Sequence, residues 1–303
     1  MPGERRYGMD HNHYKWNPII SRPSFKWPGG ARIAVCVLVN LEHSEWDPPK
    51  DSFVTDMAGG LGWKPFPNYP LLSHREYGHR VGIFRVLSIL EKYGVDATVP
   101  MDALTAKHYP YLVQYIQDHK CEIIGHGISA SQMITSNMLE KDERKYIQYS
   151  IHTLKEATGL YPNGWLGPEF GESSRTPQIL AEEGIRYVCD WVNDDQPYRM
   201  ESSSGELFAL PVSWELDDIH VLWRRSVKID RYCRMIKENF DTLYQEGASS
   251  GRLLVLNLHP WLIGQPFRIG YLDDALAHIA SHNDVWIARG TEIINWFQNA
   301  QID

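Results

Sequence analysis

The feature that most constrains the fold is the run RLLVLNLHPWLIGQPFRI, from Arg252 to Ile269. Leu253 to Leu258 is almost continuously apolar, which is typical of a strand that is buried on both faces of a parallel sheet. His259 and Pro260 follow this apolar run directly, at the point where we expect the backbone to leave the core. Because active sites of parallel α/β folds lie at the carboxyl ends of strands, His259 is either a functional group or a histidine that merely ends a strand.

Strand-like and helix-like segments alternate over the whole chain. The expected strands cover residues 32–41, 96–100, 121–125, 186–190, 207–212, 253–258 and 285–288. The expected helices cover residues 82–93, 110–119, 137–157, a segment that begins at 176, and then 229–245, 272–280 and 291–297. This order predicts an α/β protein whose parallel sheet is curled into a barrel-like body, so that the strand ends share one face. We expect one domain over residues 31–303, with residues 1–30 as an arm packed on it.

The composition and charge of the chain exclude several functional classes. A chain of 303 residues with 43% hydrophobic content can bury a substantial core. The net charge of -8, without a basic stripe to offset it, argues against nucleic acid or an anionic membrane as a partner. No apolar signal region and no run of 18 apolar residues is visible, so neither export nor membrane spanning is expected. Four scattered cysteines without a CxxC pair favour a cytoplasmic location.

Residues 47–77 form a long segment rich in proline, glycine and aromatic side chains. Connections of this length inside a compact domain are usually lids, binding loops or assembly elements, so we expect the segment over a cleft or at an interface. The eleven tryptophans and sixteen tyrosines exceed what a core of this size needs. Together with the amino-terminal arm, these features favour a homo-oligomer.

Titratable side chains follow several of the expected strands or lie in a glycine-rich turn. They are Glu42, His43, His126, Glu169, Asp190, Asp195 and His259. Carboxylates and imidazoles that converge on one cleft can supply a general base, a general acid and, where a metal binds, its ligands, which is equipment for hydrolysis. No phosphate-binding glycine loop, GxSxG elbow or HExxH helix competes with this interpretation. Glu42 and His43 could instead begin a solvated loop, and Asp190 and Asp195 could brace the barrel.

The order of these residues resembles the polysaccharide-deacetylase superfamily, also called the NodB-homology or carbohydrate-esterase-4-like fold, and within it the branch of the metal-independent allantoinases. The resemblance spans residues 16 to 298 and implies a deformed (β/α) barrel that adds water across a C–N amide bond. It is carried by WPGGARIAV at 27–35, REYGHRVGIFRVL at 75–87, EIIGHG at 122–127, GW at 164–165, YVCDWVNDDQPY at 187–198 and LHPWLIGQPFRI at 258–269. The last two motifs are long and specific.

The chain departs from the metal-dependent deacetylases, in which an aspartate pair after the first strand supplies a base and a ligand and an HxxxH motif supplies two more ligands. Glu42 and His43 replace the pair, and Ala130 stands where the second histidine would follow His126. Glu169 stands near the turn where the family commonly places an arginine. The resemblance therefore implies no Asp-His-His zinc triad, and leaves open both an atypical zinc site, with His43, His126 and Glu169 as candidate ligands, and no metal at all.

We therefore expect a hydrolase of non-peptide C–N amide bonds that acts on a small cyclic ureide, imide or related amide. Glu42 would deprotonate the attacking water, His126 would position the water or polarise the carbonyl, and His259 would protonate the leaving nitrogen. The residues expected to contact the substrate are Trp46, Glu169, Asp190, Asp195 and Trp261. The alternatives are a zinc-dependent N-deacetylase of an acetylated sugar or peptidoglycan fragment, and a non-catalytic binding protein on a deacetylase scaffold.

Overall fold

The computed structural model describes residues 9–50, 52 and 67–300. The strands in this part of the chain form one sheet in the order β6-β7-β5-β4-β3-β2-β1-β8, and β9 pairs with β1. Neighbouring strands run parallel apart from β6 and β7, which are antiparallel. The strands are β1 (Ile33–Val39), β2 (Thr98–Met101), β3 (Glu122–Gly125), β4 (Gly164–Trp165), β5 (Tyr187–Val188), β6 (Tyr198–Met200), β7 (Leu207–Ala209), β8 (Arg252–Leu258) and β9 (Val285–Ile287).

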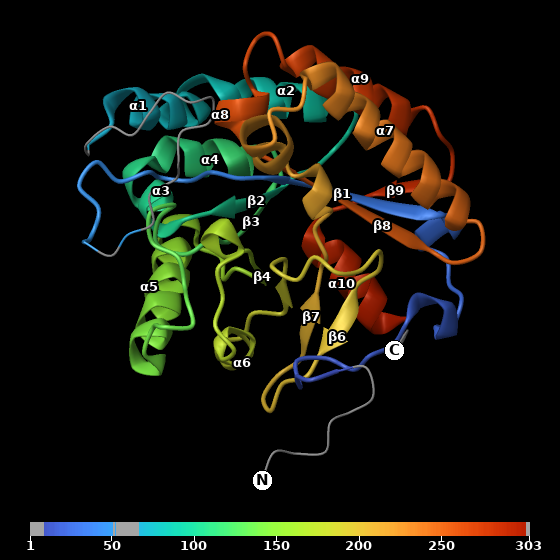
Figure 1. Cartoon of the computed structure of the whole chain (residues 1–303), viewed down its shortest axis with the longest axis horizontal. Coiled ribbons are helices and arrows are strands. Elements are labelled where there is room, and N and C mark those ends of the chain that lie inside the picture. The colour runs from blue at the N-terminus through green and yellow to red at the C-terminus, as the bar shows by residue number, and fades with distance from the viewer. Residues whose placement is uncertain (1–8, 51, 53–66, 301–303) are drawn as a thin grey trace.

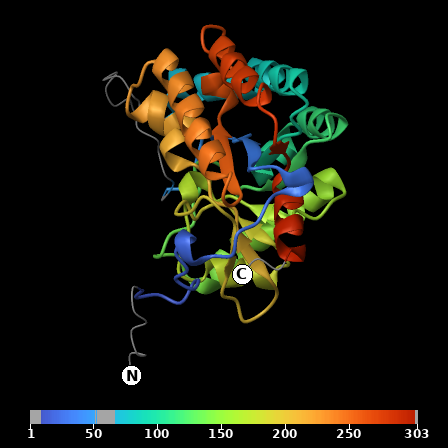
Figure 2. The ribbon, with the colours of Figure 1, turned by 90° about the vertical axis from the view of Figure 1, so that its right-hand side faces the viewer.

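The sheet curls into a half-barrel with helices around it (Figure 1, Figure 2), which confirms the predicted deformed (β/α) barrel. The longest pairing joins β1 to β8 over seven residues, from Ile33 opposite Arg252 to Val39 opposite Leu258. The chain that follows β7 then approaches the free side of β8. There the Ser213 amide donates a hydrogen bond to the Val255 carbonyl at 3.1 Å, so the barrel is nearly closed at this edge.

All seven residues of β1 are buried, because the strand lies between two cores. Its odd-numbered residues pack with α2 (Ile83–Lys92), α7 (Ile229–Glu246) and α9 (Ile269–Ala280). Its even-numbered residues pack in the second core, with Trp27 and α10 (Gly290–Asn299). Figure 1 shows α7 and α9 on one side of the sheet and α10 on the other. Both faces of the strand therefore need apolar side chains, which explains the unbroken hydrophobic run in the sequence.

The other helices are mostly those that the sequence predicts. They are α3 (Ala103–His108), α4 (Pro110–Asp118), α5 (Glu140–Thr158), α6 (Thr176–Glu182) and α8 (Pro260–Ile263). The expectation of one irregular connection over residues 47–77 is wrong at its end, where α1 (Tyr69–Tyr77) forms. A proline in the first turn and the side chain of Asn68, which accepts a hydrogen bond from the Leu71 amide, start this helix. Residues 51 and 53–66 of the same segment lie outside the described residues.

The described part of the expected arm, residues 9–30, lies against the body. Its Trp27 indole donates a hydrogen bond to the Arg252 carbonyl at 2.7 Å, and Arg22 forms a half-buried ion pair with Asp194. None of the helices within residues 9–300 that the structure describes combines the length and the apolar character needed to span a bilayer.

The backbone that carries His259 packs directly against the junction between α1 and α2. This junction is a π-helical turn, Gly78–Gly82, and it contacts α8. A Cβ atom on Gly82 would lie 2.0 Å from the Pro260 carbonyl oxygen, and one on Gly78 would lie 3.0 Å from the Trp261 amide nitrogen. Only glycine therefore lets the two backbones approach this closely.

Replacing Gly82 with alanine should destabilise the protein by about 1–3 kcal/mol, because the new methyl group has to displace the backbone of α8. Gly270 provides a matched control, since it is also a helical glycine but has no atom within 4 Å of an added Cβ. Gly270→Ala should leave stability unchanged or raise it by up to about 1 kcal/mol. Urea unfolding measures both values, and equal effects would contradict the proposed close packing at Gly82.

Candidate active site

Glu42, His126 and His259, the three predicted catalytic residues, meet at the carboxyl ends of β1, β3 and β8. Glu42 Oε1 lies 3.2 Å from His126 Nε2, and Glu42 Oε2 lies 3.7 Å from His259 Nε2. All three side chains are largely buried. The barrel therefore holds one carboxylate between two imidazole rings.

His126 is oriented by a backbone carbonyl as well as by Glu42. Its Nδ1 atom lies 2.6 Å from the carbonyl oxygen of Leu166, which follows β4. A carbonyl oxygen only accepts hydrogen bonds, so Nδ1 carries a proton, and Nε2 must also carry one in order to donate to an ionised Glu42. Burial lowers the pKa of His126, but the hydrogen bond and the charge of Glu42 outweigh it and raise the pKa. His126 is thus held between two hydrogen-bond acceptors.

His259 has a carboxylate partner on its other ring nitrogen. Asp218 Oδ1 lies 2.6 Å from His259 Nδ1, and Asp218 Oδ2 accepts a hydrogen bond from the His259 amide at 2.9 Å. Burial lowers the pKa of His259, but the charges of Asp218 and Glu42 prevail and raise it to about 9. The sequence analysis does not single out Asp218, although the adjacent acids at 217 and 218 follow an expected strand.

The charge of Glu42 is stabilised in return by its surroundings. Burial by itself raises the pKa of this carboxyl group, but the charge of His259 and the hydrogen bond from His126 lower it to about 2. Arg75 lowers it further. At neutral pH the centre of the site is therefore an ionised Glu42 beside a protonated His259, and the same charge of Glu42 raises the pKa of His126.

A second row of polar side chains lies beside this centre. Asn40 Nδ2 donates to Asn257 Oδ1 at 2.7 Å, and Asn257 Nδ2 donates to Asp217 Oδ2 at 2.7 Å. His220 Nδ1 lies 2.9 Å from Asp217 Oδ1, which extends the row. The row ties β1 and β8 to the segment after β7, so the loops that carry the titratable groups are held in fixed positions.

These groups line a small pocket of about 20 Å³. Glu169, a predicted substrate contact and candidate ligand, lines the same pocket. Its backbone has a φ of 53°, which is uncommon for a residue other than glycine, and its carboxylate forms an ion pair with Arg224. Arg224 ends the turn Ile219–Arg224, so the pair connects two loops at the pocket.

Five predicted site residues do not line this pocket, and three of them are Trp261, Trp46 and His43. Trp261 is buried, and its ring lies against the guanidinium of Arg75. Trp46 is 38% exposed and donates a hydrogen bond from its indole nitrogen to Glu76 at 2.9 Å. The ring of His43 contacts the ring of His108, with 5.1 Å between ring centroids. Substrate contacts by the two tryptophans, and metal binding by His43, stay predictions.

Asp190 lies beneath the turn that carries Glu169, outside the residues that line the pocket. Its Oδ1 atom accepts a hydrogen bond from the Gly167 amide at 2.7 Å, and burial raises the pKa of Asp190 to about 7. The contact with Gly167 agrees with the bracing alternative. A direct contact of Asp190 with substrate stays a prediction.

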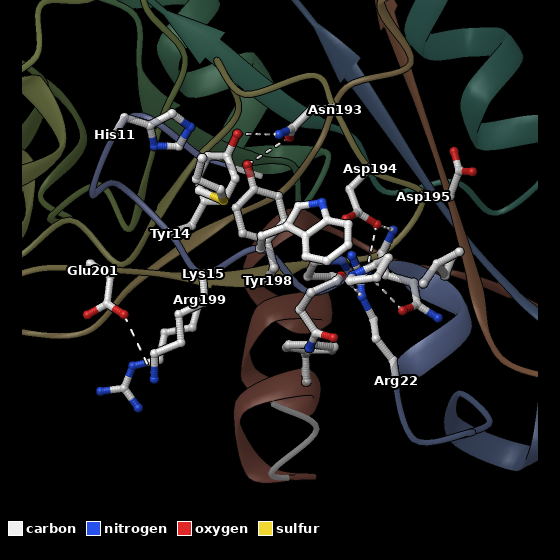
Figure 3. Close-up of a pocket in the computed structure, with 18 of the residues that line it drawn as sticks. His11, Tyr14, Lys15, Arg22, Asn193, Asp194, Asp195, Tyr198, Arg199 and Glu201 are labelled. Carbon is white, nitrogen blue, oxygen red and sulfur yellow. Dashed lines mark hydrogen bonds and ion pairs between the residues drawn. The ribbon is translucent and has the colours of Figure 1, made fainter. Parts of the chain in front are cut away.

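Asp195 lies in a different cavity, of about 1050 Å³, between residues 9–23 of the arm and residues 193–201. Figure 3 shows Asp194 and Arg22 joined by an ion pair in this cavity, with Tyr14 and Tyr198 nearby. Asp195 and Glu42 line different cavities. The geometry therefore does not bring Asp195 to the group of Glu42, His126 and His259.

The donors around Glu42 do not fit a zinc triad. Glu42 and His126 supply two groups, but Ala130 offers no ligand where the second histidine of an HxxxH motif would stand. His126 Nδ1 is already bound to the Leu166 carbonyl. Among the described residues, the sets of three close metal-ligating side chains are Asp217 with Asp218 and His259, and Asp241 with His278 and His282.

In neither set are all three side chains free to bind a metal ion. In the first set, the hydrogen bond between His259 and Asp218 takes up two of the donor groups. The second set lies on α7 and near the end of α9, where His278 Nε2 lies 2.7 Å from Asp241 Oδ1. We therefore derive no step that passes through a metal ion.

Comparisons with known proteins agree with this fold. The family model for polysaccharide deacetylase matches residues 76–188. A Schizosaccharomyces pombe protein described as a polysaccharide deacetylase is 25% identical over 91% of this chain and 92% of its own length. A peptidoglycan deacetylase of Helicobacter pylori is 23% identical over 77% of this chain and 89% of its own length.

The chain is similar to the polysaccharide deacetylase family over residues 76–188 and shares the fold of its solved structures. It is also similar to the solved structure of PuuE allantoinase, with a TM-score of 0.85 and 27% identity over 98% of this chain and 99% of the other. These findings agree with the predicted family resemblance, whereas an allantoinase-like activity stays a prediction.

We expect dialysis against a chelator to leave the melting temperature unchanged, because the groups around Glu42 already satisfy one another without a metal ion. Elemental analysis and thermal unfolding before and after dialysis measure this. His278→Ala serves as the control, since it removes the second set of candidate ligands. Stoichiometric zinc that is retained in His278→Ala and lost in His126→Ala would contradict the prediction.

Proposed function

We propose that this chain hydrolyses a non-peptide C–N amide bond in a small cyclic ureide, imide or related amide. The observation that carries the proposal is the Glu42 carboxylate between the imidazoles of His126 and His259, with Asp218 behind His259. The similarity to PuuE allantoinase over nearly the whole chain supports this substrate class. The replacement of the family's aspartate pair by Glu42 and His43 supports it further.

The two proton transfers of an amide hydrolysis fit the protonation states of the site. Glu42 takes a proton from the attacking water, whose oxygen forms the new bond to the carbonyl carbon. His259 gives its Nε2 proton to the nitrogen as the C–N bond breaks, and Asp218 stabilises its cationic form beforehand. His126 orients the carboxylate and keeps its second oxygen free for the water.

The low pKa of Glu42 makes it a weak base, so its transfer depends on the acid beside it. Proton gain by Glu42 removes a negative charge, while proton loss by His259 removes a positive charge 3.7 Å away. The two steps therefore compensate each other electrostatically when they occur together. The proton on Glu42 can then return to His259, which restores the starting state without another group.

Glu42→Gln should lower kcat by at least about 10³-fold, and His259→Asn should lower it by about 10²–10⁴-fold, because each removes one proton transfer. The loss in His259→Asn should be largest for substrates with poor leaving nitrogens. Steady-state kinetics on a panel of cyclic ureides and imides measure both effects. Glu140→Gln and His152→Asn, on the exposed face of α5, are matched controls. Near-normal turnover in Glu42→Gln would remove Glu42 from the role of base.

Activity should fall as the pH rises through about 9, because His259 then loses the proton that it donates. No acid limb is expected near pH 4–5, where an ordinary glutamate titrates, because Glu42 is ionised down to about pH 2. Asp218→Asn removes the charge that raises the pKa of His259, so the alkaline limb should move to lower pH. Profiles of kcat/KM against pH test this, and an unmoved limb would argue against His259 as the acid.

A further inference from the structure

Arg75, on α1, is a buried cation without a hydrogen-bonding partner among the residues that the structure describes. It is 9% exposed, and its guanidinium carbon lies 3.5 Å from the ring centroid of Trp261 and 5.8 Å from that of Trp223. Within residues 9–50, 52 and 67–300, no side chain or carbonyl accepts a hydrogen bond from this guanidinium, and no carboxylate forms an ion pair with it. A guanidinium has five N–H donors, so leaving it buried and unpaired is costly.

The side chains around Arg75 offer further donors rather than acceptors. The indole nitrogens of Trp223 and Trp261 are buried and have no partner among the described residues. Arg268 is the second cation here, and among the described residues its guanidinium donates a hydrogen bond to the Leu262 carbonyl alone, at 3.1 Å. Burial and the charges of Arg75 and Arg268 lower the pKa of His74, so that ring stays neutral. The cluster thus has an excess of positive charge and of hydrogen-bond donors.

The carboxylates nearest to Arg75 form ion pairs with other residues. Arg75 lies close enough to Glu42, Glu169 and Asp218 to feel their charges. Glu42 is bound by His126, Asp218 is bound by His259, and Glu169 is paired with Arg224. Within the described part of the chain, these contacts leave Arg75 beside Glu42 and His259 without a counter-ion of its own.

We propose that Arg75, with Arg268 and the two indole nitrogens beside it, forms a subsite for a carboxylate group of the substrate. This inference rests on the proposed function and narrows it: the amide that this chain hydrolyses carries a negative charge close to the scissile bond. A planar guanidinium fork matches the two oxygens of a carboxylate, and the stacked Trp261 ring fixes its orientation.

The subsite is held rigidly against the catalytic histidine. Arg75 belongs to the helix whose end packs on α8, where a Cβ on Gly78 would meet the Trp261 backbone. Trp261 is two residues from His259 and also contacts Arg75. A carboxylate bound by Arg75 therefore fixes the position of the attached amide relative to the acid that protonates it.

Arg75 could instead serve only to offset the charge of Glu42, and the two roles have different consequences. A group that only balances Glu42 affects all substrates equally and shifts the pH profile. A carboxylate subsite affects charged substrates alone. We therefore compare two hydantoins of similar size, hydantoin-5-acetate, which is anionic, and 5-ethylhydantoin, which is neutral.

The wild type should prefer hydantoin-5-acetate in kcat/KM. Arg75→Gln should lower kcat/KM for hydantoin-5-acetate by about 10–100-fold, the loss expected for a charge-assisted hydrogen-bonding pair, and for 5-ethylhydantoin by less than 3-fold. Arg75→Lys should retain part of the preference, because it keeps the charge and loses the fork. Arg80→Gln, an exposed arginine in the adjoining turn, is the matched control and should change neither value. Equal losses for the two hydantoins would overturn the subsite.

Binding measurements separate this inference from the proposed reaction. Calorimetric titration of the wild type, Arg75→Gln and Glu42→Gln with both hydantoins requires no turnover. Tighter binding of hydantoin-5-acetate that is lost in Arg75→Gln but kept in Glu42→Gln supports the subsite even if no hydrolysis is found. Equal binding of both compounds, or no measurable binding of hydantoin-5-acetate, overturns it.

Discussion

The seven-residue pairing of β1 with β8 is the constraint on which the site depends. It aligns the carboxyl ends of both strands, so the residues that leave them, Glu42 and His259, come within reach of each other. The hydrogen bond between Asn40 and Asn257 reinforces the alignment just before the strands end. Because the pairing is buried on both faces, a slip of one residue would move apolar side chains into the wrong core. The separation of Glu42 and His259 is therefore fixed by the fold itself.

Burying this many charges is expensive unless each one is neutralised locally. In the site, the Glu42 carboxylate stands between the imidazoles of His126 and His259, and Asp218 in turn balances His259. A hydrogen bond from His126 to the backbone adds orientation without another charge. Water offers no comparable arrangement, because its dipoles would have to reorganise as each proton moves, whereas the protein holds these dipoles in place before the substrate arrives.

Periodicity and apolar runs were sufficient to predict the barrel, most of its strands and the meeting of Glu42, His126 and His259, because strand ends in a parallel sheet share an edge. The partners of these residues were harder to predict. Asp218 and Arg224 lie in a segment after β7 whose turns have no strong sequence pattern. Arg75 lies on α1, and the proline-rich sequence around this helix does not predict a helix. Asp195 follows the same expected strand as Asp190, but it lines another cavity, because the irregular chain after that strand leads away from Glu42.

The contact between the Gly78–Gly82 turn and α8 joins the first third of the chain to the last. Arg75 and His259 are therefore held in a fixed relative position by this packing, although they are far apart in sequence. Insertions before α1 can lengthen or reshape whatever precedes this helix without moving these two residues. In relatives with this contact, new substrate preferences should accordingly arise from substitutions of side chains on the surface of α1. The spacing between positions 75 and 259 should stay the same.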